Sequence, residues 1–192
     1  MSIFPIPWQE ALQGCRLSIE NAERLASDSQ VLRRNGRSQS AYSVSLDAWE
    51  ELGKAILLYT YYKTQEPISR NDWQQILTDH KHKRVAWVSG VDILYGATPP
   101  KSVTKLKEDL KKHLTDDWRK WFKLERDVGV YVDWVGGKEP WLSPCRIDKK
   151  WFSFVPFDSE YWARSVIDQC RHFRERLLAN HPLKVDRERN PS

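Results

Sequence analysis

The chain has few cysteines, and their positions exclude several kinds of site. Its 192 residues include only Cys15, Cys145 and Cys170, which are odd in number and lie far apart. They provide no C-x-x-C pair and no disulfide framework of the kind that small secreted domains commonly need. We therefore expect a reduced, cytoplasmic setting.

Long apolar runs and targeting signals are also missing. No stretch approaches the roughly 20 apolar residues that a membrane-spanning helix needs. The first residues, MSIFPIPWQE, lack the basic and apolar regions of a secretory signal peptide. The sequence therefore predicts no membrane partner, and a cytoplasmic location is the expectation.

Motifs typical of cofactor and metal sites do not occur. No glycine-rich loop opens a helix, as nucleotide binding would require, and there is no G-x-S-x-G nucleophile elbow. His80 and His82 lie roughly 200° apart around a helix, so they cannot hold one ion together. His113, His172 and His181 have no ligand partner at a useful spacing. We expect neither a metal nor a cofactor.

The chain is instead rich in aromatic and basic residues. It contains 10 tryptophans, 40% of its residues are hydrophobic, and its formal net charge is +5. This composition predicts one folded domain with a sizeable core, and the positive charge permits RNA as a partner. Because the tryptophans exceed what one core of this size usually encloses, we expect a homodimer with an aromatic interface. The candidates for that interface are Trp118, Trp121, Trp134 and Trp141.

Hydrophobic periodicity predicts an all-α fold, an antiparallel bundle of four to five helices. The expected helices cover residues 8–32, 38–63, 70–94, 103–126 and a last segment that begins near 156–158 and ends at 180. Residues 128–155 alternate aromatic and β-branched side chains with polar ones around Gly136 and Gly137, which predicts a short hairpin or an ordered loop. We expect residues 1–182 to form a single domain and the charged tail, 183–192, to be disordered.

Charged side chains occupy helical faces that should be apolar. One stripe of the third expected helix consists of Trp73, Ile76, His80, Lys83, Trp87 and Leu94. A stripe of the second consists of Asp47, Glu51, Lys54 and Leu58. Buried charge costs several kcal/mol unless it is paired. Neighbouring helices that carry such groups can satisfy each other, so we predict one inter-helix cluster of Glu51, Lys54, His80 and Lys83.

Two interpretations of this cluster remain open. In the first, Glu51 pairs with Lys83 or His80 and fixes the register of the two helices. In the second, the cluster is a reaction site, where His80 is a general acid or base and Lys54 and Lys83 hold an anion such as phosphate.

Several short motifs occur in a fixed order along the chain. They are Asn21, Ala22, Leu25 and Asp28, then Ala48, Glu50, Glu51, Gly53 and Lys54, then His80 and Lys83, then Gly129, Tyr131, Val132 and Asp133, followed by Pro140. Together they resemble the AbiV family of abortive-infection proteins, which is related to the HEPN superfamily of small helical bundles. The resemblance implies a HEPN-like bundle, dimeric, that arrests a phage-infected cell by acting on RNA or translation. It also implies a phage or host protein as the trigger or target.

One departure from the HEPN pattern bears on catalysis. Active HEPN ribonucleases resemble each other in an Arg followed, after four to six residues, by a His on one late helix. Here only Arg174 or Arg176 with His181 fits, and one such match is expected by chance. The predicted cluster is therefore the better catalytic candidate. His80 would activate a ribose 2′-hydroxyl and the two lysines would stabilise the phosphorane, with no metal. The alternative is a non-catalytic interaction or RNA-binding module that acts through a dimer surface.

The segment around Tyr131 also has two possible interpretations. Tyr131 and Asp133 are candidates for substrate binding if their side chains face the cluster. Alternatively, Tyr131 and Trp134 cap the open end of the bundle, and this reading is preferred.

Overall fold

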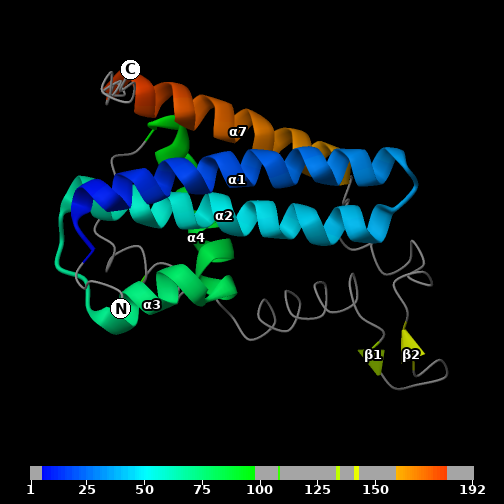
Figure 1. Cartoon of the computed structure of the whole chain (residues 1–192), viewed down its shortest axis with the longest axis horizontal. Helices are drawn as coiled ribbons and strands as arrows, with labels where there is room; N and C mark the ends of the chain where they lie inside the picture. Colours follow the sequence, from blue (N-terminus) through cyan, green and yellow to red (C-terminus); the bar gives the residue numbers. More distant parts are fainter. Residues whose placement is uncertain (1–5, 98–107, 109–132, 135–140, 143–158, 181–192) are drawn as a thin grey trace, which may run out of the picture.

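Two long antiparallel helices form the body of the molecule. The computed structural model describes residues 6–97, 108, 133–134, 141–142 and 159–180. Helices α1 (Trp8–Arg34) and α2 (Ser38–Thr64) lie side by side along the length of the molecule (Figure 1). In the turn between them Gly36 has a φ of 74°, and the N–H of Arg37 donates to the carbonyl of Leu32 at 2.9 Å. Glycine adopts this left-handed conformation without steric cost, so Gly36 lets the chain reverse direction between the two helices.

The remaining helices pack around this pair. Helix α7 (Ser159–Asn180) lies along α1 and also contacts α2, while α4 (His80–Tyr95) packs against α2 and α7. The short α3 (Arg70–Thr78) lies beside α4 and the end of α2 (Figure 1). The predicted all-α bundle is confirmed. None of the helices in the described part is both long enough and apolar enough to span a membrane.

The third expected helix proves to be two helices. We predicted one helix over 70–94, but α3 ends at Thr78 and α4 begins at His80, with Asp79 between them. The carbonyl of Asp79 accepts the N–H of Lys83 at 3.3 Å, which begins the hydrogen bonding of α4. Asp is among the preferred residues at this position. The apolar spacing continues through the break, so periodicity alone could not reveal it.

A short hairpin is present where the sequence predicted one. Strand β1 (Asp133–Trp134) pairs antiparallel with β2 (Trp141–Leu142), with Trp134 opposite Trp141. The predicted helix over 103–126, apart from Glu108, and the expected tail lie outside the described residues.

The core lies where α1, α2 and α7 meet. The buried side chains of the first two helices include Cys15, Ile19, Ala22 and Ala26 of α1, and Ala41, Ala48, Leu52, Ala55 and Tyr59 of α2. The edge of Phe173 on α7 packs against the ring of Tyr59, with centroids 5.1 Å apart. Burial of these side chains is the main favourable contribution to folding.

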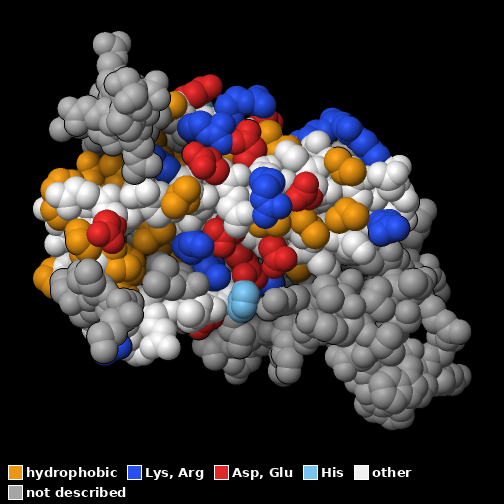
Figure 2. All heavy atoms as spheres, in the orientation of Figure 1, with side chains coloured by type: hydrophobic (Ala, Val, Ile, Leu, Met, Phe, Trp, Pro, Cys, Tyr) orange, Lys and Arg blue, Asp and Glu red, His pale blue; other side chains and the backbone are white. Residues whose placement is uncertain are grey.

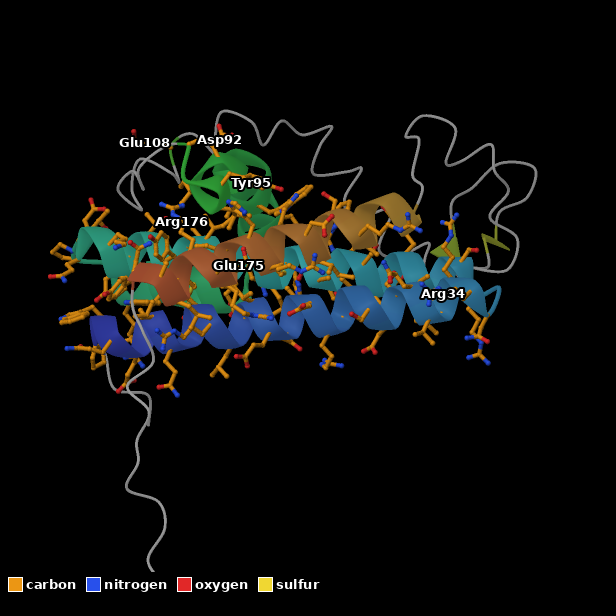
Figure 3. The ribbon with its side chains drawn as sticks, turned by 90° about the horizontal axis from the view of Figure 1, so that it is seen from above. Arg34, Asp92, Tyr95, Glu108, Glu175 and Arg176 are labelled. Atoms are coloured by element: carbon orange, nitrogen blue, oxygen red, sulfur yellow. The ribbon has the colours of Figure 1, made fainter. Side chains whose placement is uncertain are left out.

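Arg176 ties α7 to the end of α4. Its guanidinium donates to the carbonyl of Ile93 and lies 5.9 Å from the ring of Tyr59. Gly96, the residue that follows the end of α4 at Tyr95, has a φ of 72°. Figure 3 shows Arg176 reaching from α7 toward this end of α4, where Asp92 and Tyr95 lie. A cation that binds the last carbonyls of a helix also complements the negative end of its dipole.

Candidate functional site

A glycine brings the backbones of α2 and α4 together at the site. A Cβ at Gly53 would lie 1.7 Å from the carbonyl oxygen of Lys83 and 3.2 Å from the backbone nitrogen of Trp87. No other residue leaves room for such an approach. The first turns of α4 therefore lie directly against the middle of α2, where Glu50 precedes Gly53 by one turn.

Glu50 is a buried carboxylate surrounded by cations from α4. Its Oε1 accepts from Arg84 Nε at 2.8 Å and lies 2.7 Å from Arg84 Nη2. Its Oε2 pairs with Nδ1 of His80 and lies 3.9 Å from Nζ of Lys83. The side chains of Glu50, Lys83 and Arg84 are only 4%, 7% and 4% exposed. Each buried charge is thus paired, as burial requires.

His80 differs from the other members of this network because it reaches solvent. Its side chain is 48% exposed. A carboxylate can only accept hydrogen bonds, so the pairing with Glu50 assigns a proton to Nδ1 of His80. The second ring nitrogen, Nε2, takes no part in this pairing. A histidine oriented by a buried carboxylate is a typical general acid or base. Figure 2 shows acidic and basic side chains gathered together on one face of the molecule.

A pair of stacked tryptophans packs next to the charge network. The rings of Trp49 and Trp87 are stacked, with centroids 4.8 Å apart and an interplanar angle of 11°. Nε1 of Trp87 donates to Oε1 of Gln169 on α7 at 2.8 Å, and Nε2 of Gln169 donates to Ser165 at 3.0 Å. Because Trp49 adjoins Glu50 in the chain, this stack links α2, α4 and α7 beside the charge network.

Glu51 and Lys54 lie in a different place. Nζ of Lys54 donates to Oε1 and Oε2 of Glu51 at 3.0 and 2.8 Å. Both side chains line a groove between α1 and α2 with a volume of about 460 Å³, which Asn21 also lines. The pair is partly buried, with side-chain exposures of 17% for Glu51 and 23% for Lys54.

The predicted cluster is therefore divided in two. His80 and Lys83 do meet a glutamate of α2, but that glutamate is Glu50, whereas Glu51 bonds to Lys54 in its own helix. The prediction that Glu51 pairs with His80 or Lys83 was wrong, because the preceding residue, Glu50, makes these pairs. Successive residues of a helix point about 100° apart, so the two glutamates face different neighbours. Glu50 and Arg84 were missed, although Glu50 precedes Gly53 by three residues and so shares its face.

The other proposed site residues are placed only in part. Asp133 belongs to β1, opposite Leu142. Tyr131 lies outside the described residues, as do Trp118, Trp121 and His181. The two arginines of the C-terminal motif have structural partners: Arg174 donates to Glu23 of α1, and Arg176 donates to Ile93 of α4.

Within the described ranges, no group of three or more His, Cys, Asp or Glu side chains is arranged to hold a metal ion. Cys15 and Cys170 are both buried. Burial raises the pKa of the Cys170 thiol to about 12 and also raises the pKa of Cys15 above its ordinary value. Thiols that keep their protons are poor nucleophiles, so these two are structural.

The described helices thus define an all-α bundle with a histidine–carboxylate pair at the contact of two helices. The sequence model of the AbiV family of HEPN proteins matches residues 10–154, more than half of the chain, and the chain belongs to this family. Membership indicates a role in abortive infection, a form of defence against phage. Searches of the curated proteins and of the solved structures found no match.

Proposed function

We propose that the protein arrests a phage-infected cell by cleaving RNA in the cytoplasm, with His80 as the catalytic residue. The observation that carries this proposal is the pairing of His80 with Glu50. A buried carboxylate fixes Nδ1 and leaves Nε2 on a half-exposed ring. This is the arrangement that general base catalysis requires.

The reaction would follow the metal-independent route to a cyclic phosphate. Nε2 of His80 takes the proton of a ribose 2′-hydroxyl, and the 2′-oxygen forms a bond to the adjacent phosphorus. The bond from phosphorus to the 5′-oxygen breaks, and that oxygen takes a proton from water as it leaves. His80 then returns the proton on Nε2 to the solvent. The products carry 2′,3′-cyclic phosphate and 5′-hydroxyl ends. Lys83 and Arg84 are too buried to touch the phosphate, so they hold Glu50 and His80 in position.

The burial of Glu50, Lys83 and Arg84 favours a second function. Lys83 and Arg84 each pair with Glu50 beneath the surface, which is what a structural lock between two helices would show. The protein would then be a non-catalytic module that binds RNA or a phage or host protein through a dimer surface. Both functions include a homodimer and a trigger delivered by infection.

Phage survival with matched histidine variants separates the two functions. Cells expressing His80→Gln, His172→Gln or His181→Ala would be challenged with a phage that the wild-type protein blocks. His172 is the matched control because it is an exposed histidine on α7. We expect His80→Gln to melt near the wild-type temperature and to lose protection, while His172→Gln protects normally.

The RNA of the infected cells gives the second measurement. Cleavage by His80 predicts new 5′-hydroxyl ends in wild-type cells and their loss in His80→Gln cells. If a folded His80→Gln variant protects fully, the catalytic proposal is wrong. Loss of protection by His181→Ala alone would then assign catalysis to the C-terminal motif, and full protection by every variant would favour the interaction module.

A further inference from the structure

The groove between α1 and α2 has features of a ligand site that the His80 proposal does not use. Its volume of about 460 Å³ lies in the range of small-molecule sites. Its polar residues include Glu10 and Ser18 of α1 and the Glu51–Lys54 pair of α2. Apolar contact surface comes from Leu17 and Leu58, among others.

The shape of the groove suits a linear molecule. Its lining on α1 begins at Glu10 and ends at Asn21, which corresponds to roughly 16 Å along the helix axis. Gly14 lies midway, where a Cβ would be 3.2 Å from Cδ1 of Leu58. The missing side chain therefore deepens the groove at its centre. Leu17 beside it is 57% exposed, an apolar surface that a ligand could cover. Figure 2 shows hydrophobic side chains at the end of the molecule where α1 begins.

The charges of the groove favour a cation. The lining includes two carboxylates, those of Glu10 and Glu51, and one ammonium group, that of Lys54, so it carries one net negative charge. Salt screens charges that lie farther away than about 8 Å, so the groups lining the groove contribute most to its preference. A phosphate or carboxylate ligand would meet like charge. A purely apolar ligand would cover the polar Glu51–Lys54 pair without offering it a hydrogen bond, which costs free energy.

We propose that this groove binds a linear aliphatic amine of the diamine or polyamine class. The ammonium groups of the ligand donate to the carboxylate oxygens of Glu51 and Glu10, and its methylene chain lies over Leu17, Gly14 and Leu58. Each carboxylate oxygen of Glu51 accepts one hydrogen bond from Lys54 and has a second lone pair for the ligand. Ser18, which is 2% exposed, offers a hydroxyl oxygen in the same groove.

Calorimetric titration of the full chain with spermidine tests the proposal. The protein is first treated with nuclease, because bound RNA would itself attract a polyamine. We expect saturable binding to the wild type and no binding of an uncharged alkanediol of similar length. Glu51→Gln should weaken spermidine binding by at least about tenfold, since it removes the charge that the ammonium group contacts.

Two further variants give the location of the site. Glu175→Gln is the matched control, because it makes the same charge change on α7, away from the groove (Figure 3). It should bind like the wild type. Gly14→Ala fills part of the groove without changing its charge and should weaken spermidine binding. If Glu51→Gln does not fold, Gly14→Ala and Glu10→Gln together replace it as the test of the site. The proposal is overturned if folded wild-type protein gives no binding heat at millimolar spermidine. It is also overturned if the groove variants bind as tightly as Glu175→Gln.

Discussion

Glu50 and Glu51 are neighbours in the chain but lie in different surroundings. Glu50 faces α4 and is almost fully buried, whereas Glu51 faces the groove beside α1 and remains partly exposed. A buried carboxylate that loses its charge leaves its cations without compensation, and this is far more costly than the loss of an exposed pair. The two glutamates therefore form a natural comparison for the energetic role of the charge network.

We predict that Glu50→Gln lowers the free energy of unfolding by about 3–5 kcal/mol, because it leaves Lys83 and Arg84 buried without a counter-charge. Glu51→Gln should lower it by about 1 kcal/mol or less, since solvent reaches its pair with Lys54. Urea denaturation followed by circular dichroism measures both values. Equal losses for the two variants would contradict the assignment of Glu50 as the central carboxylate.

The buried thiol of Cys170 makes stability depend on alkaline pH. Burial raises its pKa from 9.0 to about 12, so between these values the unfolded chain loses the proton while the folded chain keeps it. The free energy of unfolding should therefore keep its full value below about pH 9 and fall as the pH rises toward 12. Denaturation at several pH values should show a smaller decline for Cys170→Ala than for the wild type. An identical decline in both proteins would mean that this thiol is not protected by burial.

At the scale of secondary structure, the position of α4 depends on the absence of a side chain at Gly53. The nearest atom to an added Cβ is a backbone carbonyl, which cannot move aside as a flexible side chain can. At Gly14 the nearest atom is the end of the Leu58 side chain, at 3.2 Å. The same substitution at the two positions thus tests backbone contact against side-chain contact.

We predict that Gly53→Ala destabilises the protein by about 3 kcal/mol or more, because α2 and α4 must separate to admit the methyl group. Gly14→Ala should change stability by no more than about 1 kcal/mol, since the gain in helix propensity offsets a small adjustment of Leu58. Thermal and urea unfolding of the two variants provide the comparison. A Gly53→Ala variant as stable as the wild type would show that the helices are not in backbone contact.

Periodicity predicted the long helices well and the contacts between them poorly. The expected helices over 8–32 and 38–63 end within two residues of α1 and α2, because their turns and apolar stripes are strong local signals. The break at Asp79 was missed because Trp73, His80 and Lys83 keep helical spacing across it. The choice of Glu50 over Glu51 depends on where α4 crosses α2, and a stripe on one helix does not contain that information.

For the whole molecule, the sequence was sufficient to predict the family and the helical bundle, whereas the homodimer is still a prediction. The two strands place Trp134 opposite Trp141, so two of the four proposed interface tryptophans are neighbours in one hairpin. Paired aromatic residues are well suited to an interface, because they bury a large area with little loss of side-chain freedom.

We therefore predict a homodimer that depends on the hairpin. Light scattering of the wild type at micromolar concentration should give twice the chain mass of 22.7 kDa. The double variant Trp134→Ser, Trp141→Ser should give the monomer mass while keeping the helical circular dichroism spectrum. A monomeric wild type would contradict the dimer, and a dimeric double variant would place the interface elsewhere.

The stacked rings of Trp49 and Trp87 give the molecule an optical property of its own. Two indoles in face-to-face contact absorb as an electronically coupled pair, and such coupling produces a split circular dichroism band that isolated tryptophans lack. One ring belongs to α2 and the other to α4, so the band exists only while these helices are docked. Its intensity would report, in solution and in real time, whether a trigger or an RNA loosens the helix that carries His80.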